Sequence, residues 1–515
     1  INGGKVTAKG GYNGVSNAPG IGGSTSAKSD GTLTISSADV LDGNTTLGAK
    51  GTYTITGDPT ADMIVVSEDL IYNGKVQELD GKIYIDDSKT GTGTYFGQTF
   101  TVNASADGWT YTIDPAVVKA AGDYTVTFSK EGHTSISKTF TVAQSGTQFV
   151  GDGEVKTFNG ETQTDTFTAG DTITVKATPT PTGAAPTNSA MFAASFTPPT
   201  TGQMAVFVGD TQVSQPAEAV DGSYTMEVSA ADVLLAAGGP GTGITLTAKF
   251  VGNDNMADGT GTATVNITAA ARVEKDSTTS YVDKNGLNTV FAYNSGYEDA
   301  TVTLLDDLTN TDYANRPKID IRCTLNLNGH TLRSDLSSVP TLEVSANGNV
   351  TIAGSGEIVS NSDAALYVAG TAVLEGGIFR SGGTYHGAVE VLNSLSGNLS
   401  VTGENVVMEN TGSGYGLLIY SLKSVKLSAG KYSGAAGAIS VSTDAFTLSS
   451  LLNQEGTSRV AYYKDNTTLV TEGLDGQTLP SGSYTVKACN HTGEGVCEYT
   501  PNEGAETHAM TCLAC

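Results

Sequence analysis

Between residues 341 and 450 the apolar positions follow one short pattern that recurs five times. Within a copy, apolar and polar residues alternate, as at Leu342 and Val344, which places the apolar side chains on one face of a strand. The copies occupy residues 341–344, 365–368, 388–391, 417–420 and 438–441, and a second segment of the same kind follows each, at 349–352, 371–374, 398–401, 424–427 and 445–448. A unit of about 20 residues cannot bury such a face alone, so the copies must stack. The pattern predicts the rungs of a parallel β-solenoid.

Upstream of the repeats, alternating segments recur at a spacing that is typical of β-sandwiches. Seven of them lie at 52–55, 63–66, 82–85, 99–102, 109–113, 123–128 and 138–142. A second set extends from about residue 145 to 271. Each set also contains one expected helical piece, over 114–122 and over 231–238, and the first of these has Pro115 near its start and Gly122 at its end.

The composition agrees with an all-β chain of several domains. A chain of 515 residues is too long to fold around a single hydrophobic core. Sustained helical periodicity is almost absent. Acidic residues outnumber basic ones by 53 to 27, so the formal charge is −26, and it is spread along the chain. Such a surface repels nucleic-acid phosphates and anionic membranes, so we expect neither as a partner. No apolar run reaches the length of about 18 residues that predicts a membrane span.

Three stretches resemble families of bacterial surface proteins. The glycine-rich residues 1–11, 20–23 and 31–35 resemble β-solenoid repeats of large surface proteins. Residues 250–267 resemble the closing hairpin of bacterial immunoglobulin-like domains. The succession of 287–293, 300–309 and 325–332 resembles the entry into right-handed parallel β-helices of the pectate-lyase-like superfamily in large Gram-positive surface proteins. In those proteins a short helix covers the open end of the first rung, which would otherwise invite aggregation.

These resemblances imply an all-β fold with two immunoglobulin-like β-sandwiches and a right-handed parallel β-helix. The expected domains are partial β-solenoid turns at 1–46, the first sandwich at 47–144, the second at 145–271, the β-helix with its N-terminal cap at 272–486 and a truncated Cys/His-rich module at 487–515. We expect the chain to be a monomeric fragment of a larger protein.

The β-helix raises the question of catalysis, since many proteins with this fold cleave acidic polysaccharides. Such cleavage needs paired carboxylates at a fixed spacing, or calcium with a basic residue. Asp306 and Asp307 are adjacent, and adjacent residues on a strand point to opposite faces. His330 is expected in a turn and His386 in a loop, with neither beside a carboxylate pair, and Arg380 is the lone arginine of the repeats. The sequence therefore predicts a non-catalytic β-helix.

The C-terminal residues contain a group of potential metal ligands: Cys489, His491, Cys497, His508, Cys512 and Cys515. Cys-x-x-Cys with a histidine four residues upstream is half of a zinc-binding module, so structural zinc is one expectation. Two disulfides and an unformed stub are the alternatives. The acidic stretches 254–258 and 86–87 do not have the spacing of a defined Ca²⁺ loop, so solvated turns are expected there. Cys323 lies in an alternating segment and is expected to be a buried apolar side chain.

The leading functional hypothesis is a secreted or wall-attached adhesin that binds a host or environmental glycan or protein. The contact would be made by sandwich loops, such as the Pro- and Thr-rich residues 178–202, or by a face of the solenoid. Two further hypotheses are a polysaccharide lyase or hydrolase that uses the β-helix, and a structural stalk. A sandwich that grips a host immunoglobulin is a variant of the adhesin.

Overall fold

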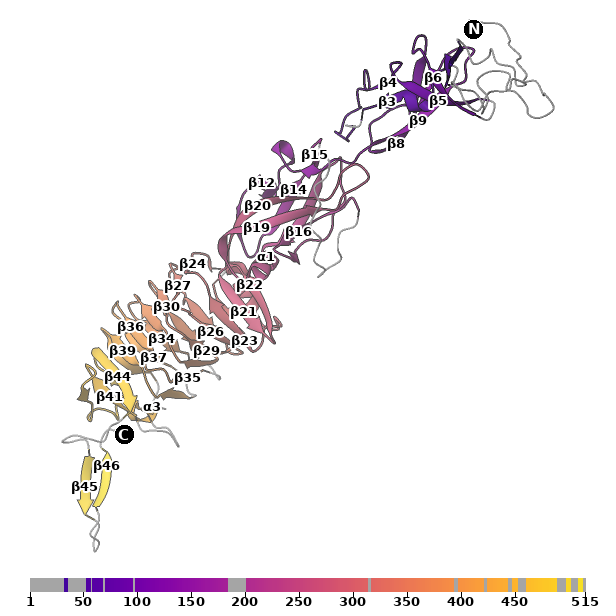
Figure 1. Ribbon diagram of the computed structural model, residues 1–515. Coiled ribbons are helices and arrows are strands. Elements are labelled where there is room, and N and C mark those ends of the chain that lie inside the picture. The colour runs from indigo at the N-terminus through magenta and orange to yellow at the C-terminus, as the bar shows by residue number, and fades with distance from the viewer. Residues whose placement is uncertain are drawn as a thin grey trace, which may run out of the picture.

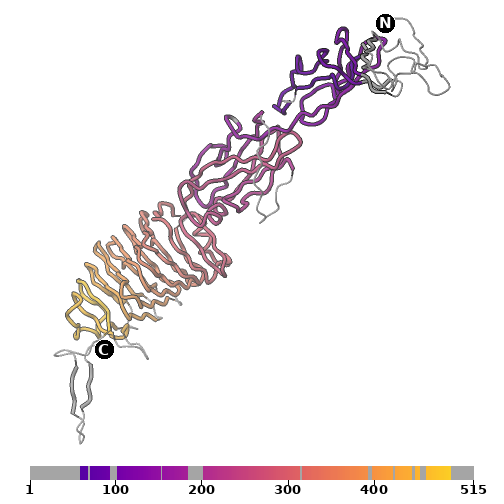
Figure 2. Tube along the Cα trace, viewed as in Figure 1, coloured from indigo at the N-terminus to yellow at the C-terminus, as the bar shows by residue number. Residues whose placement is uncertain are grey.

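The computed structural model is an elongated all-β array in which three β-rich units follow one another along the chain (Figure 1). Figure 2 shows the same order along the Cα trace. The all-β class and the β-solenoid expected from the sequence are confirmed. Within the described residues, no helix has both the length and the apolar character needed to cross a membrane.

The structure describes most of the chain. The described residues are 32–35, 52–56, 58–67, 70–95, 98–183, 201–313, 316–392, 397–420, 424–442, 447–452, 460–488, 497–501 and 508–512. For 32–35, 52–56, 93–95, 98–100, 497–501 and 508–512 the description is of the backbone alone.

The first unit consists of small sheets, ordered β1-β2-β6-β5, β3-β4 and β7-β8-β9. Its elements are β1 (Thr32–Ile35), β2 (Thr52–Thr56), η2 (Ala61–Met63), β3 (Ile64–Val66), β4 (Ile83–Ile85), β5 (Thr90–Tyr95), β6 (Gln98–Asn103), β7 (Thr110–Asp114), β8 (Gly122–Ser129) and β9 (Ile136–Val142). Trp109 is half-buried and packs against the core of this unit. The helix expected over 114–122 is wrong: Asp114 stays paired with Thr125 of β8, which holds the chain extended, and bends follow.

The second unit has two sheets, β12-β11-β14-β18 and β13-β20-β19-β16-β17, which share one apolar core. Its elements are β10 (Thr147–Gln148), η3 (Gly151–Gly153), β11 (Lys156–Asn159), β12 (Thr162–Gln163), β13 (Thr166–Thr168), β14 (Thr172–Ala177), β15 (Thr180–Pro181), β16 (Met204–Val208), β17 (Thr211–Gln212), β18 (Tyr224–Ser229), α1 (Ala230–Ala237), β19 (Gly241–Phe250) and β20 (Gly259–Thr268). The predicted helix over 231–238 is confirmed as α1, which ends at Gly238 with a left-handed φ of 82°.

Direct contacts join the units. Asn255 of the second unit accepts hydrogen bonds from the backbone N–H of Ala121, through its side chain at 2.8 Å, and of Ser145, through its carbonyl at 3.0 Å. At the other junction, Tyr281 belongs to the strand that leads into the solenoid, yet its side chain is buried in the core of the second unit. Each junction is therefore held by packing or hydrogen bonds in addition to the connecting chain.

The third unit is the solenoid. Its elements are β21 (Ala271–Lys275), β22 (Thr278–Val282), α2 (Lys284–Phe291), β23 (Ala300–Leu304), β24 (Leu308–Asn310), β25 (Lys318–Ile319), β26 (Arg322–Asn326), β27 (Thr331–Ser334), β28 (Leu342–Val344), β29 (Asn349–Ala353), β30 (Glu357–Ser360), β31 (Leu366–Val368), β32 (Thr371–Leu374), β33 (Ile378–Ser381), β34 (Gly387–Val391), β35 (Asn398–Val401), β36 (Val407–Asn410), β37 (Tyr415–Ile419), β38 (Val425–Leu427), β39 (Lys431–Gly434), β40 (Gly437–Val441), α3 (Leu448–Leu452), β41 (Val460–Lys464), β42 (Thr468–Leu469), β43 (Thr478–Leu479) and β44 (Gly482–Ala488). A separate pair, β45 (Cys497–Pro501) and β46 (His508–Cys512), follows it.

Each turn of the solenoid contributes one strand to each of three sheets, and the chain winds five times between β23 and β38. The first sheet contains β23-β26-β29-β32-β35-β38, the second β24-β27-β30-β33-β36-β39 and the third β25-β28-β31-β34-β37-β40. Strands within a sheet are parallel, and the register stacks one buried column of the third sheet as Leu342, Leu366, Val389, Leu417 and Ile439. The predicted stacking is confirmed.

The solenoid has three strands per turn, whereas the sequence pattern indicated two. The missed strands form the second sheet, in which one inward position of each strand from β24 to β36 holds a polar residue. These are stacked in register as Asn310, Ser334, Ser360, Ser381 and Asn410, all of them buried, and we call them the inner polar column. Polar residues at inward positions remove half of the apolar alternation from which a strand is recognised.

Antiparallel strands close both ends of the solenoid. At the N-terminal end, β21 pairs antiparallel to β23, and α2 buries Leu287, Val290 and Phe291 against the solenoid core. The expected capping helix is thus confirmed. At the C-terminal end, β44 and β43 pair antiparallel to β39 and β40, in the region expected to be less regular. Of the last expected strand, over 445–448, residues 445 and 446 lie outside the described residues. Its end is wrong, because Leu448 begins α3 and is buried in the core.

Substitution of Asn410 tests whether the inner polar column stabilises the solenoid. Its side-chain amide donates to the carbonyls of Gly383 at 3.1 Å and His386 at 2.8 Å, and its side-chain oxygen accepts from the N–H of Gly414 at 3.1 Å. Asn410→Ala should lower the free energy of unfolding of the solenoid by about 2 to 4 kcal/mol, because buried backbone groups lose their partners. Urea denaturation followed by far-UV circular dichroism measures the change.

Asn349→Ala is the matched control, since Asn349 is exposed on the first sheet and should change stability by less than about 0.5 kcal/mol. Trp109 is the single tryptophan of the chain and lies in the first unit, so its fluorescence reports that unit separately. Equal losses in the two variants, or a shift of the Trp109 transition in Asn410→Ala, would contradict the assignment.

Candidate functional site

The candidate site is built on the third sheet, around the bends that lead into it from the second sheet. The register aligns the outward positions of successive strands as Glu343, Tyr367, Glu390, Leu418 and Ser440. Side chains alternate along a strand, so these residues stand opposite the buried Leu and Val columns. Tyr367 and Glu390 are therefore neighbours on adjacent rungs.

His386 lies in the bend before β34 and joins three groups into one cluster. Its Nδ1 lies 3.0 Å from Glu390 Oε1, 3.5 Å from Asp363 Oδ1 and 3.4 Å from the Tyr367 hydroxyl. The side chains of Glu390 and Asp363 are each 4% exposed, whereas that of His386 is 35% exposed. Two buried carboxylates thus meet a half-exposed imidazole and a phenol. We call these four residues the His386 cluster.

The inner polar column holds the cluster in place. The Ser381 hydroxyl donates to the carbonyl of Asp363 at 2.6 Å, and the backbone N–H of Asp363 donates to the Ser360 hydroxyl at 3.1 Å. The carbonyl of His386 accepts the Asn410 amide. Both bends that supply the cluster are therefore tied to side chains inside the solenoid.

Burial controls the electrostatics of the cluster. It raises the pKa of the Glu390 carboxyl above its usual range, since charge is disfavoured away from water. The Gly387 N–H and His386 act in the opposite direction, and Asp363 adds to the rise. Burial, followed by the negative charges of Glu390 and Asp363, raises the pKa of Tyr367, so its hydroxyl keeps its proton. The cluster presents a phenol and an imidazole beside a carboxyl group whose pKa is raised.

Exposed tyrosines lie next to the cluster in the sequence and on the following rung. Tyr385, next to His386, is 82% exposed, and Tyr420, after β37, is 37% exposed. The pKa of Tyr420 is raised by its partial burial and by the charge of Glu390. Nearer the N-terminal end, the Arg316 guanidinium lies 5.4 Å from the centre of the exposed Tyr313 ring. We call Tyr385 and Tyr420 the aromatic surface; their rings offer flat apolar faces together with hydroxyl groups.

His330 and His386, the two histidines considered in the sequence analysis, have different surroundings. His330 lies after a turn, as expected, with its Nδ1 3.5 Å from Asp307 Oδ1. Asp306 and Asp307 lie between β23 and β24, so the argument from opposite strand faces does not apply to them. His386 lies in a loop, as expected, but the expectation that it has no carboxylate pair nearby is wrong. A bend brings Asp363 to it from the preceding rung, and Glu390 reaches it from β34, the strand that follows His386.

Arg380, the lone arginine of the repeats, is neutralised on the second sheet. Its guanidinium contacts Glu357 at 2.5 Å and Glu409 at 2.9 Å, on the rungs before and after its own. Through these two ion pairs Arg380 links three successive rungs of the solenoid. Cys323 is buried, as expected, and burial raises the pKa of its thiol to about 12.

Metal ligation was expected at the C-terminus. Cys489, His491 and Cys515 lie outside the described residues, and for Cys497, His508 and Cys512 only the backbone is described, in β45 and β46. Among the side chains that the structure describes, no group of three or more His, Cys, Asp and Glu could hold a metal ion. In the acidic turns, Asp258 accepts the Gly252 N–H at 2.8 Å and Asp86 pairs with Lys89 at 3.3 Å.

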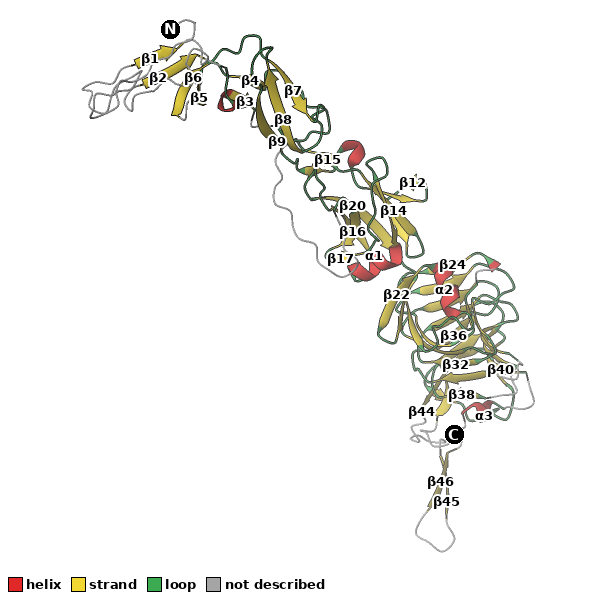
Figure 3. Cartoon of the chain, turned by 90° about the vertical axis from the view of Figure 1, so that its right-hand side faces the viewer, coloured by secondary structure: helices red, strands yellow, loops and turns green. Residues whose placement is uncertain are grey.

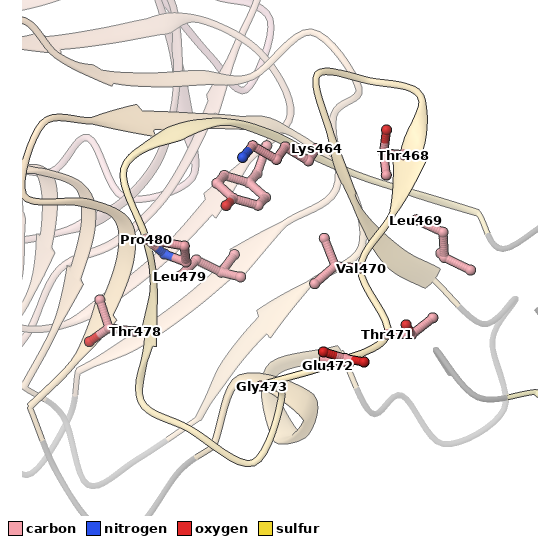
Figure 4. A pocket seen from close by; sticks show the side chains of 11 residues that line it. Lys464, Thr468, Leu469, Val470, Thr471, Glu472, Gly473, Thr478, Leu479 and Pro480 are labelled. Atoms are coloured by element: carbon pink, nitrogen blue, oxygen red, sulfur yellow. The ribbon is translucent and has the colours of Figure 1, made fainter.

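A hollow lies at the C-terminal end of the solenoid (Figure 4). Its volume is about 340 Å³, and it lies between the β41–β42 hairpin and the segment that leads to β43. Leu469, Val470, Leu479 and Pro480 line it, with Lys464 and Glu472 among its charged residues. Its lining carries neither a histidine nor a carboxylate pair, unlike the His386 cluster.

No protein-family model and no curated protein matches the sequence. A solved structure that is similar is a Ca²⁺-stabilized adhesin that helps an Antarctic bacterium reach out and bind ice, with 17% sequence identity and a TM-score of 0.15. The match covers 44% of this chain and 55% of that chain, so it spans about half the length of the adhesin. A TM-score this low carries no argument about fold or function.

Substitution of Glu390 tests the electrostatics of the cluster. A carboxyl whose pKa is raised by folding binds its proton more tightly in the folded state, so its contribution to stability is lost as pH rises from the unfolded pKa through the folded one. The ordinary value is 4.5. Glu390→Gln has no proton to lose there, so its free energy of unfolding should rise relative to the wild type between about pH 4 and about pH 7. Urea denaturation at both pH values measures the difference.

Glu375→Gln, in an exposed position just after β32, is the matched control. A pH profile shared by the two variants, or a relative fall in the stability of Glu390→Gln as pH rises, would contradict the account based on burial.

Proposed function

We propose that this chain is part of an extracellular, non-catalytic adhesin that binds a glycan on the aromatic surface around the His386 cluster. The observation that supports the proposal is that Tyr385, 82% exposed, directly precedes in the chain His386, whose imidazole contacts Glu390 on the solenoid. Aromatic rings bind the apolar faces of sugars, and nearby polar groups fix orientation and specificity. A host or environmental protein is the other class of ligand that the adhesin hypothesis includes.

The remaining units agree with a role in presenting this surface. We infer that the first two units are immunoglobulin-like sandwiches that act as spacers. The sequence patterns that resemble those of Gram-positive surface proteins support a secreted or wall-attached location. The formal charge of −26 supports a soluble protein that avoids nucleic acid and anionic membranes.

Polysaccharide hydrolysis is the second candidate, because two carboxylates meet at His386 and one has a raised pKa. Glycosidases use such a pair, with the protonated member as acid. The geometry favours binding over hydrolysis, however. Both carboxylates are almost fully buried, Asp363 accepts the Ala364 N–H at 2.6 Å, and Glu390 accepts the Gly387 N–H at 2.9 Å. A catalytic acid must reach the glycosidic oxygen, whereas these oxygens are engaged inside the protein.

A glycan array with the purified chain, followed by calorimetry of the best ligand, tests the proposal. Tyr385→Ala should weaken binding about tenfold, which corresponds to about 1.4 kcal/mol, because a stacking surface is lost. Tyr293→Ala is the matched control, since Tyr293 is 65% exposed and follows α2, at the N-terminal cap of the solenoid. Equal loss in both variants would reject the aromatic surface as the binding site, and no retained ligand would favour the stalk.

The same samples separate binding from catalysis. The bound glycan should show no new reducing or unsaturated ends after prolonged incubation. Release of such ends by the wild type, with loss in both Asp363→Asn and Glu390→Gln, would replace the adhesin with a polysaccharide-degrading enzyme.

A further inference from the structure

The last two described strands, β45 and β46, form an antiparallel pair with no further strand beside it in the described part of the chain (Figure 3). An isolated two-stranded hairpin is at best marginally stable in water, because it has no second layer on which to bury side chains. Small units of this kind are usually held by a cross-link or a metal ion. A cross-link or a bound metal ion would therefore add to the stability of this hairpin.

The register of the hairpin places two cysteines opposite each other. Cys497 pairs with Cys512 at the end where the chain enters and leaves, and Pro501 pairs with His508 at the end next to the connecting loop. Residues directly opposite in an antiparallel pair have Cα atoms about 4.5 to 5.5 Å apart. Disulfides join Cα atoms at about 4.4 to 6.8 Å, so this backbone placement suits a cross-strand disulfide.

The same register separates His508 from the cysteine pair. His508 and Cys512 are four residues apart on one strand, which at about 3.3 Å per residue places their Cα atoms about 13 Å apart. Zinc bonds to nitrogen and sulfur are about 2.0 to 2.3 Å long, so ligands of one ion must converge. On this register His508 and Cys512 cannot bind the same ion, and the histidine-containing zinc module is disfavoured.

We propose that Cys497 and Cys512 form an intrachain disulfide that closes the hairpin at its base. The two thiols lose two protons and two electrons to a small-molecule disulfide, such as oxidised glutathione, which is reduced to two thiols. The cross-link limits the freedom of the unfolded loop between the two residues and so favours the paired state. The proposal rests on the strand register and is independent of glycan binding.

Peptide mapping tests the pairing. The full chain is equilibrated with oxidised glutathione, its free thiols are alkylated under denaturing conditions, and it is cleaved after glutamate. Cleavage after Glu494, Glu498 and Glu506 separates Cys489, Cys497 and the fragment that carries Cys512 and Cys515. The expected product is fragment 495–498 linked to fragment 507–515, lighter than the two thiol forms by two hydrogen atoms. Fragmentation spectra locate the link at Cys512.

Two variants make the test decisive. Cys515→Ser should retain the link between the two fragments, whereas Cys512→Ser should lose it. Alkylated Cys497, or Cys497 linked to Cys489 or Cys515, would overturn the proposal. So would a chain prepared with zinc alone that retains one equivalent of the metal and resists oxidation at Cys497 and Cys512.

Discussion

The in-register stacking of parallel strands is the constraint on which the rest of the solenoid depends. Each strand of the third sheet places an apolar residue directly over the corresponding residue of the previous rung, as Leu366 lies over Leu342. The stacking buries columns that no single rung could bury, and it pairs the backbone of every inner rung on both sides. The two outermost rungs lack one neighbour. The antiparallel strands β21 and β44 supply backbone partners for the outermost rungs, and α2 covers apolar side chains at the N-terminal end.

The same stacking creates the candidate site. Asp363, His386 and Glu390 come from two consecutive turns of the solenoid, and their side chains meet because the turns are in register. Hydrogen bonds from the inner polar column also fix the bends between the strands. Ser381 and Asn410 bind backbone groups beside Asp363 and His386, so the bends have fixed positions although they are not regular structure. Buried polar groups that are hydrogen-bonded, as Ser381 and Asn410 are, make such a core specific as well as stable.

The sequence predicted the parts of the fold whose inward residues are apolar. The first and third sheets were recognised because Val350 and Ile352, or Val389 and Val391, alternate with polar residues. The second sheet was missed because Ile358 is followed by inward-facing Ser360, and Phe379 by Ser381. The helix α2 was found from its amphipathic pattern. At Asp114 the local signals of a helix were overridden by pairing with β8, a tertiary effect that propensity does not contain.

The candidate site was less accessible to sequence reasoning. His386 and Glu390 are four residues apart, but nothing in that spacing indicates a contact outside a helix, and Asp363 belongs to the preceding turn. One feature of the sequence does indicate that two residues of the cluster are neighbours. Tyr367 and Glu390 occupy the same place in successive copies, between two buried apolar residues. Comparing outward positions between copies identifies neighbours, although it leaves the residues of the bends unplaced.

The closure of the solenoid by separate caps has a consequence for its length. Inner rungs contact only their neighbours, and both caps bind to the outermost rungs without reaching the middle. Duplication or deletion of one whole three-strand turn would therefore leave the caps and their contacts unchanged. A variant with one whole turn added or removed should therefore keep both caps, while loss of a single strand would shift every later side chain out of register. The length of the solenoid can therefore change in steps of one turn.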